Sequence, residues 1–251
     1  MKWLILLLVP TMVFAKVKTE KVVYEKDGVK MEGLLAYNDS VKGKRPGILV
    51  FHDWMGNGPY TEMRAKQLAQ KGYIAFAADI YGQGVRPTDM KGASDLATKY
   101  KTDRSTMRAR AQAALATLLT QKNVDATKTA AIGFCFGGTV ALELARDGAP
   151  VKGIVSFHGG LSAPVKATIL TPKILALHGA DDPYVPAAEV AEFQAEMRAA
   201  KADWEFIAFG NAVHSFTQKE AGNDNSKGAA YNELAEKRSM REMDSFFKEI
   251  L

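Results

Sequence analysis

The chain has 251 residues, enough for one large α/β domain or two small ones. Apolar residues make up 47% and charged residues 24%, which are ordinary values for a globular domain and argue against a disordered chain, a collagen or a coiled coil. The 33 Lys and Arg only slightly exceed the 28 Asp and Glu and form no dense basic run, so nucleic acid is not an expected partner.

The N-terminus has the pattern of a cleavable secretory signal. Lys2 gives a positive segment, residues 3–14 are mainly apolar, and Val13-Phe14-Ala15 fits a cleavage site. An apolar stretch of 12 residues is shorter than the roughly 20 that span a bilayer, although an uncleaved membrane anchor is the alternative. We therefore expect residues 1–15 to be a signal peptide and 16–251 a single domain, periplasmic or secreted in a bacterium, with no stable membrane insertion after cleavage.

The domain is expected to begin with a short antiparallel hairpin, because β-like runs at 22–24 and 29–36 flank a turn at 26–28. Continuous apolar runs then recur along the chain, which is typical of strands that are buried on both faces of a mostly parallel sheet. These runs lie at 47–51, 73–78, 129–134, 153–157, 173–177 and 205–209.

Segments between these runs have the helical period. Apolar residues recur every three or four positions from Met107 to Leu119, from Val190 to Met197 after Pro186, and from Met243 to Ile250. The alternation of strands and helices, without a linker or a repeat, predicts a three-layer α/β sandwich with a mostly parallel central sheet.

The strongest chemical signal is Gly133-Phe134-Cys135-Phe136-Gly137, which lies between a predicted strand and a predicted helix. It is the nucleophile-elbow pattern with Cys in place of Ser. Side chains at the two glycines would collide in so sharp a turn, and the sulfur would stand at a helix N-terminus, which stabilises a thiolate. Cys135 is the only cysteine of the chain, so it has no disulfide partner; the alternative is a buried, inert thiol.

A nucleophile needs a base and the base needs an orienting acid. Asp182 lies in a loop stiffened by Pro183 and Pro186, with Asp181 as the alternative acid, and His214 follows the last predicted strand. The order of nucleophile, acid and histidine is that of α/β-hydrolases.

The other three histidines also follow predicted strands, at the edge where sites of parallel sheets gather. His52, His158 and His178 are alternative bases, although backbone hydrogen bonds near the site are the expected role. Metal ligation by His52, Asp53 and His158 stays open, but no helical histidine pair supports it, and we expect no metal and no cofactor.

From Val22 to the C-terminus the sequence resembles the dienelactone hydrolase family of the α/β-hydrolase superfamily. The resemblance implies the α/β-hydrolase fold, with Cys135 as nucleophile, His214 as base and Asp182 as orienting acid. The motifs that carry it are His52-Asp53-Trp54-Met55-Gly56, Gly72-Tyr73 together with Asp79-Ile80-Tyr81-Gly82, the elbow glycines with Cys135, Asp182 to Pro186, and His214-Ser215-Phe216.

The resemblance also implies roles for residues around the triad. The backbone N–H groups of Trp54 and Phe136 would form the oxyanion hole. Family members place Glu where Asp53 stands, and that carboxylate keeps the thiol neutral until substrate arrives, so Asp53 is the expected gate although it is one methylene shorter.

Substrate contacts are expected from Gln83, Arg86 and Gln218. Members that cleave dienelactone carry Arg at the positions of Gln83 and Gln218 and grip the substrate carboxylate with it. A neutral amide supplies neither that charge nor that bidentate geometry, and Arg86 is close enough in sequence to compensate.

The sequence therefore predicts a monomeric hydrolase of small carboxylic esters or lactones that works through a thioester. Glutamine amidotransferases share the elbow pattern, but no histidine here is followed two residues later by an acid, as theirs is. An exported binding protein without turnover and a thiol redox sensor are two further hypotheses for a chain with this fold and a single thiol.

Overall fold

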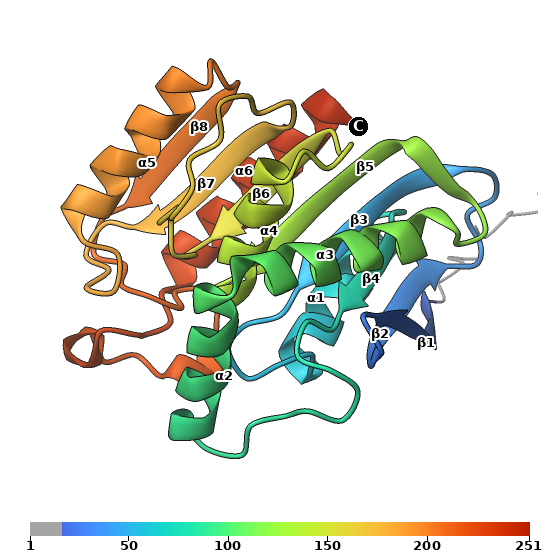
Figure 1. Cartoon of the computed structure of the whole chain (residues 1–251), viewed down its shortest axis with the longest axis horizontal. Coiled ribbons are helices and arrows are strands. Elements are labelled where there is room, and N and C mark those ends of the chain that lie inside the picture. The colour runs from blue at the N-terminus through green and yellow to red at the C-terminus, as the bar shows by residue number, and fades with distance from the viewer. Residues whose placement is uncertain (1–16) are drawn as a thin grey trace, which may run out of the picture.

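The computed structural model describes residues 17–251, and the expected signal peptide at 1–15 lies outside them. Its strands are β1 (Val17–Lys26), β2 (Val29–Asn38), β3 (Arg45–Phe51), β4 (Ile74–Ala78), β5 (Val124–Phe134), β6 (Gly153–Phe157), β7 (Lys173–Gly179) and β8 (Trp204–Phe209). They form one sheet in the order β1-β2-β4-β3-β5-β6-β7-β8 (Figure 1). β2 pairs antiparallel with both β1 and β4, and all other pairs are parallel, so the predicted sheet is confirmed.

Helices cover both faces of this sheet and complete the three layers. The helices are α1 (Pro59–Gln70), α2 (Met90–Thr102), α3 (Arg104–Leu119), α4 (Phe136–Arg146), α5 (Ala187–Ala199) and α6 (Glu233–Ile250), with short 3₁₀ turns at Lys219–Ala221 and Asn225–Lys227. Because side chains alternate along a strand, Leu49 and Phe51 of β3 join the core under α2 to α5, whereas Ile48 and Val50 join the core under α1 and α6. Figure 1 shows α3 and α4 in front of the sheet and α6 behind it.

The N-terminal hairpin is longer than its apolar pattern indicates. β1 and β2 pair from Val17 opposite Asn38 to Lys26 opposite Val29. Asp27 and Gly28 have φ values of 51° and 75°, the positive values that a two-residue hairpin turn requires. β1 is an edge strand whose side chains are mostly exposed, so its sequence lacks the apolar runs of the inner strands.

The topology brings the candidate residues to one edge of the sheet. His52 follows β3, Cys135 follows β5 and His158 follows β6, while the segments after β7 and β8 carry Asp182 and His214. Since these strands are neighbours in that order, residues far apart in sequence meet at their carboxyl ends. In residues 17–251 no helix is both long and apolar enough to span a membrane.

Candidate active site

The candidate nucleophile stands on a strained turn between β5 and α4. Cys135 has φ 55° and ψ −116°, outside the regions that a non-glycine residue usually occupies, and it is the N-cap of α4. A Cβ at Gly133 would lie 1.9 Å from the carbonyl oxygen of Gly137, and one at Gly137 would lie 2.3 Å from the carbonyl oxygen of Phe51. Both glycines are therefore required for the chain to turn here.

Cys135, His214 and Asp182 form a continuous hydrogen-bonded relay. The Sγ of Cys135 is 3.0 Å from Nε2 of His214, whose Nδ1 is 2.8 Å from Oδ2 of Asp182. Asp182 is buried, and its other oxygen accepts the backbone N–H of Tyr184 at 2.9 Å. The neighbouring Asp181 is exposed, so the structure brings Asp182 to the histidine.

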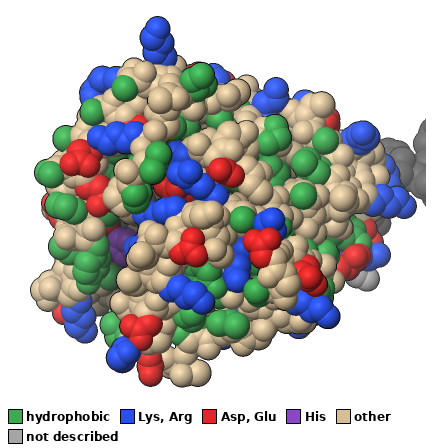
Figure 2. All heavy atoms as spheres, viewed as in Figure 1, with side chains coloured by type: hydrophobic (Ala, Val, Ile, Leu, Met, Phe, Trp, Pro, Cys, Tyr) green, Lys and Arg blue, Asp and Glu red, His purple; other side chains and the backbone are tan. Residues whose placement is uncertain are grey.

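The loop that carries His214 is held in place by backbone contacts. The N–H of His214 donates to the carbonyl of Gly228 at 3.2 Å, and the His214 carbonyl accepts from Ala230 at 3.0 Å. The ring of Tyr184 packs perpendicular to the imidazole at 5.4 Å. Figure 2 shows histidine side-chain atoms inside a recess on the face that it draws.

The electrostatics of this pair favour its charged form. Burial opposes ionisation of the Cys135 thiol, but the charge of His214 and its hydrogen bond outweigh that effect and lower the pKa of Cys135. Burial likewise opposes a charge on His214, yet the thiolate and the hydrogen bond to Asp182 raise the pKa of His214 well above its usual value. The two shifts together favour a thiolate beside an imidazolium.

Two backbone N–H groups near the elbow are available to an oxyanion. Within residues 17–251, neither the N–H of Phe136, in the first turn of α4, nor the N–H of Trp54 has a hydrogen-bond partner. Trp54 lies in the loop after β3, where the hydroxyl of Tyr81 donates to its carbonyl at 3.1 Å. These are the two groups that the family resemblance places in the oxyanion hole.

Asp53 lies beside these groups and is almost fully buried. Its carboxylate accepts the N–H of Met55 at 2.7 Å and a hydrogen bond from the side-chain amide of Gln218. Burial raises the pKa of Asp53, and the negative charge of Asp53 in turn raises the pKa of the Cys135 thiol. No hydrogen bond joins Asp53 to Cys135 in the described part of the chain, so the influence is one of charge.

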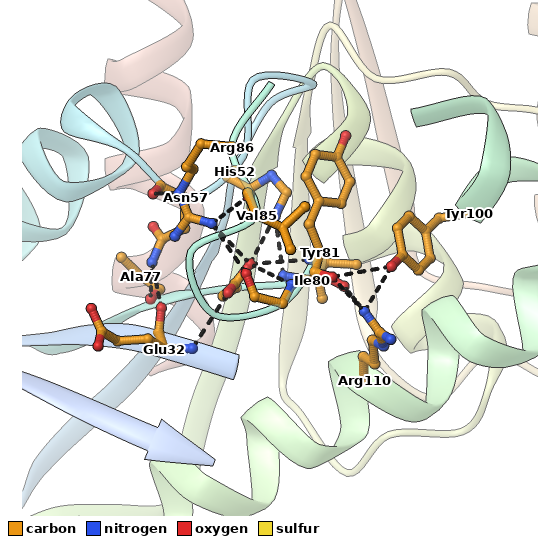
Figure 3. Close-up of polar contacts among 12 residues, drawn as sticks. Glu32, His52, Asn57, Ala77, Ile80, Tyr81, Val85, Arg86, Tyr100 and Arg110 are labelled. Carbon is orange, nitrogen blue, oxygen red and sulfur yellow. Dashed lines mark hydrogen bonds and ion pairs between the residues drawn. The ribbon is translucent and has the colours of Figure 1, made fainter. Parts of the chain in front are cut away.

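The three expected substrate contacts are engaged elsewhere in this structure. Gln218 donates to Asp53, and Gln83 donates to Glu32 at 3.0 Å. Nε of Arg86 donates to the carbonyl of Asn57 at 2.5 Å, as Figure 3 shows, and its Nη1 lies 3.6 Å from buried Asp79. None of the three side chains is hydrogen-bonded to the triad.

Two of the remaining three histidines, His52 and His158, make backbone contacts around the site. Nδ1 of His158 accepts the N–H of Cys135 at 3.1 Å, and its Nε2 is 2.8 Å from Oγ1 of Thr217. Nδ1 of His52 is 2.6 Å from the carbonyl oxygen of Asp53, in the loop after β3. His178, at the end of β7, packs against Phe206, and its buried Nδ1 has no hydrogen-bond partner within residues 17–251, so the expected backbone contact is wrong for this residue. Across residues 17–251, no three side chains of His, Cys, Asp or Glu are grouped so that they could hold a metal.

The sequence assigned no separate role to two aromatic residues that the structure places at the site. The hydroxyl of Tyr81 donates to the Trp54 carbonyl. The ring of Tyr184 packs against His214, and its backbone N–H donates to the Asp182 carboxylate. Both belong to motifs at strand ends, and that position is the signal by which they could have been found.

The chain is similar to known proteins in both sequence and fold. The profile of the dienelactone hydrolase family matches residues 31–251. A solved structure named m3DLH is 40% identical, with a TM-score of 0.90, covering 94% of this chain and 99% of its own. A dienelactone hydrolase-like promiscuous phosphotriesterase, P91, from metagenomic libraries is also 40% identical, with a TM-score of 0.88, covering 93% of this chain and 98% of its own. A putative carboxymethylenebutenolidase of Yersinia pestis is 27% identical and covers 75% of each chain.

Proposed function

The chain belongs to the dienelactone hydrolase family, of the α/β-hydrolase superfamily, and from that premise we propose that it hydrolyses carboxylic esters or lactones through a thioester on Cys135. The observation that carries the proposal is the relay from Sγ of Cys135 through the His214 imidazole to the Asp182 carboxylate, with contacts of 3.0 and 2.8 Å. A binding protein or a redox sensor does not need a histidine and an acid aligned on its thiol.

In the proposed first half-reaction, the Cys135 thiolate attacks the substrate carbonyl carbon. The oxygen becomes negative and accepts from the N–H groups of Phe136 and Trp54. The tetrahedral intermediate collapses when Nε2 of His214 gives its proton to the leaving alkoxide, and the acyl group remains on sulfur as a thioester.

The second half-reaction uses the same groups in reverse. Neutral His214 takes a proton from a water molecule, whose oxygen attacks the thioester carbonyl. The second oxyanion collapses to the carboxylic acid and the Cys135 thiolate, which restores the ion pair with His214. Asp182 keeps Nδ1 of His214 protonated throughout, so that Nε2 faces the sulfur.

Substrates without a carboxylate near the scissile bond suit this site best. The positions of Gln83 and Gln218 carry neutral amides, and the Arg86 guanidinium is already engaged by the carbonyls of Asn57 and Val85. We assign Gln83, Arg86 and Gln218 to the substrate side of the site as a proposal, with a preference for neutral esters and lactones.

We also propose that residues 1–15 are removed on export, that the mature protein is periplasmic or secreted, and that it is monomeric. These proposals rest on the sequence.

The relative P91 is a phosphotriesterase by name, and attack of the same thiolate at phosphorus is a second reaction that a substrate panel can include.

A panel of aryl esters, lactones, thioesters and aryl phosphotriesters tests the proposed function. We expect turnover of neutral esters or lactones by the wild-type protein and none by Cys135→Ala. Full turnover by Cys135→Ala would overturn the mechanism, and the absence of turnover across the panel would favour a binding protein or a redox sensor.

A further inference from the structure

The loop after β3 is held through two successive peptide groups. The carbonyl of Asp53 accepts from Nδ1 of His52 at 2.6 Å and from the N–H of Gly56 at 3.2 Å. In the next peptide, the hydroxyl of Tyr81 donates to the Trp54 carbonyl, and the N–H of Met55 donates to the side-chain carboxylate of Asp53. The polar group left over in these two peptides is the N–H of Trp54.

The proton on His52 can be placed from its two partners. Nε2 accepts the backbone N–H of Ile80 at 3.1 Å, a contact that Figure 3 shows, so this nitrogen carries no proton. The proton is therefore on Nδ1 and is donated to the Asp53 carbonyl. The ring is completely buried, and burial lowers the pKa of His52 to about 3, which keeps it neutral in that tautomer.

We infer that His52 is a positioning residue that fixes the oxyanion hole through the peptide between Asp53 and Trp54. In a planar trans peptide the C=O and the N–H point in opposite directions. Because His52 holds the carbonyl, the Trp54 N–H points away from the imidazole and stays free for the substrate oxygen. If this peptide turned over, a carbonyl oxygen would replace the donor and repel the oxyanion. The inference rests on the proposed acyl transfer, whose negative oxygen this donor would bind.

His52 also packs against two aromatic rings, so a purely structural role has to be separated from a positioning one. Its ring centroid lies 4.6 Å from that of Tyr81 and 5.7 Å from that of Phe136. Two amide variants make this separation, because both lose the aromatic ring. In His52→Asn the amide nitrogen takes the place of Nδ1 and can still donate to Asp53. In His52→Gln the amide oxygen takes the place of Nε2 and can accept from Ile80, but the donor to Asp53 is lost.

Pre-steady-state acylation and thiol reactivity are measured for both variants. We expect His52→Gln to lose about 10²- to 10³-fold in the acylation rate, the usual effect of removing one oxyanion donor, and His52→Asn to stay within about tenfold of wild type. Methyl methanethiosulfonate reacts with the thiolate at sulfur and forms no oxyanion, so its rate should be the same in both variants. Equal losses of acylation in the two variants, or a parallel loss of thiol reactivity, would show that His52 only supports the fold.

Crystal structures of the two variants give a second test that does not depend on activity. We expect the Asp53–Trp54 peptide to keep its orientation in His52→Asn and to turn or become disordered in His52→Gln. An unchanged peptide in His52→Gln overturns the inference even if the protein is an esterase. A turned peptide in a protein whose wild type forms no acyl-enzyme would support the positioning role and contradict the proposed function instead.

Discussion

Replacing Gly133 by alanine tests whether the elbow geometry depends on this glycine. The added Cβ would lie 1.9 Å from the Gly137 carbonyl oxygen, whereas ordinary contacts begin at 3.4 Å, so the two segments must separate by about 1.5 Å. Both segments are backbone, and Gly137 is itself packed against the carbonyls of Phe51 and His52, so neither can yield easily. We expect a cost at the upper end of the overpacking range, about 3 kcal/mol in the free energy of unfolding.

For a chain of this length, that cost corresponds to a Tm lower by roughly 6–12 °C in thermal unfolding followed by circular dichroism. Because the separation also moves the sulfur relative to His214 by about 1 Å, kcat/KM should fall by about 10²-fold in the folded protein. Failure of the variant to fold would agree with the same steric argument.

Gly210→Ala is the matched control. A Cβ at Gly210 would meet no atom within 4 Å, and the φ of this residue is not in the left-handed region. We expect its Tm to lie within about 2 °C of wild type, with full activity. A Gly133→Ala protein as stable and as active as Gly210→Ala would refute the reasoning about the elbow.

Two further predictions concern acidic residues at the site, and a third concerns the expected signal peptide. The loss of kcat in Asp182→Asn should be roughly 10²-fold smaller than in His214→Ala, because Asp182 orients the base and does not itself react. Asp181→Asn should match wild type, and equal losses in both aspartate variants would contradict the assignment of the acid. Asp53→Asn removes a negative charge that disfavours the thiolate, so the pKa of Cys135 should fall, and the acid limb of thiol alkylation against pH should move to lower pH; a limb that stays in place would exclude an electrostatic gate. The intact mass of the exported protein should be that of a chain that begins at Lys16, and full-length chain recovered from the inner membrane would refute cleavage.

The sequence was most informative where local rules are strict. The strand 153–157 has the predicted bounds because every residue in it is apolar or small and buried on both faces. The elbow could be located because its two glycines are required by steric contact. The order of acid and histidine along the chain indicated which residues would meet, although not at what distance.

Elements with weak apolar contrast were not predicted. α1 buries one large apolar side chain, Leu68, beside two alanines and the charged Arg64. α2 buries Tyr100 beside two alanines, so neither helix shows a repeating stripe of large apolar residues. Alanine packs close to a sheet where bulkier side chains do not fit, but its small side chain gives little periodic signal.

Partners of polar side chains depend on tertiary contacts that no spacing encodes. The amide of Gln218 is bonded to Asp53, 165 positions away, and Nδ1 of His158 accepts from Cys135, 23 positions away. The sequence could place Asp53, Cys135 and His158 at strand ends, and only the family resemblance indicated Gln218. It could not show that Gln218 would hold the proposed gate or that His158 would lie behind the nucleophile.

The most direct test of the central claim is mass spectrometry of wild-type protein quenched with acid during turnover of an ester or lactone substrate. The tryptic peptide 129–146 contains the only cysteine of the chain. The account predicts that this peptide gains the mass of the acyl group, that Cys135→Ala shows no such gain, and that hydroxylamine removes it, as expected for a thioester. Steady turnover with an unmodified peptide, or an acyl group found on a different peptide, would contradict the mechanism.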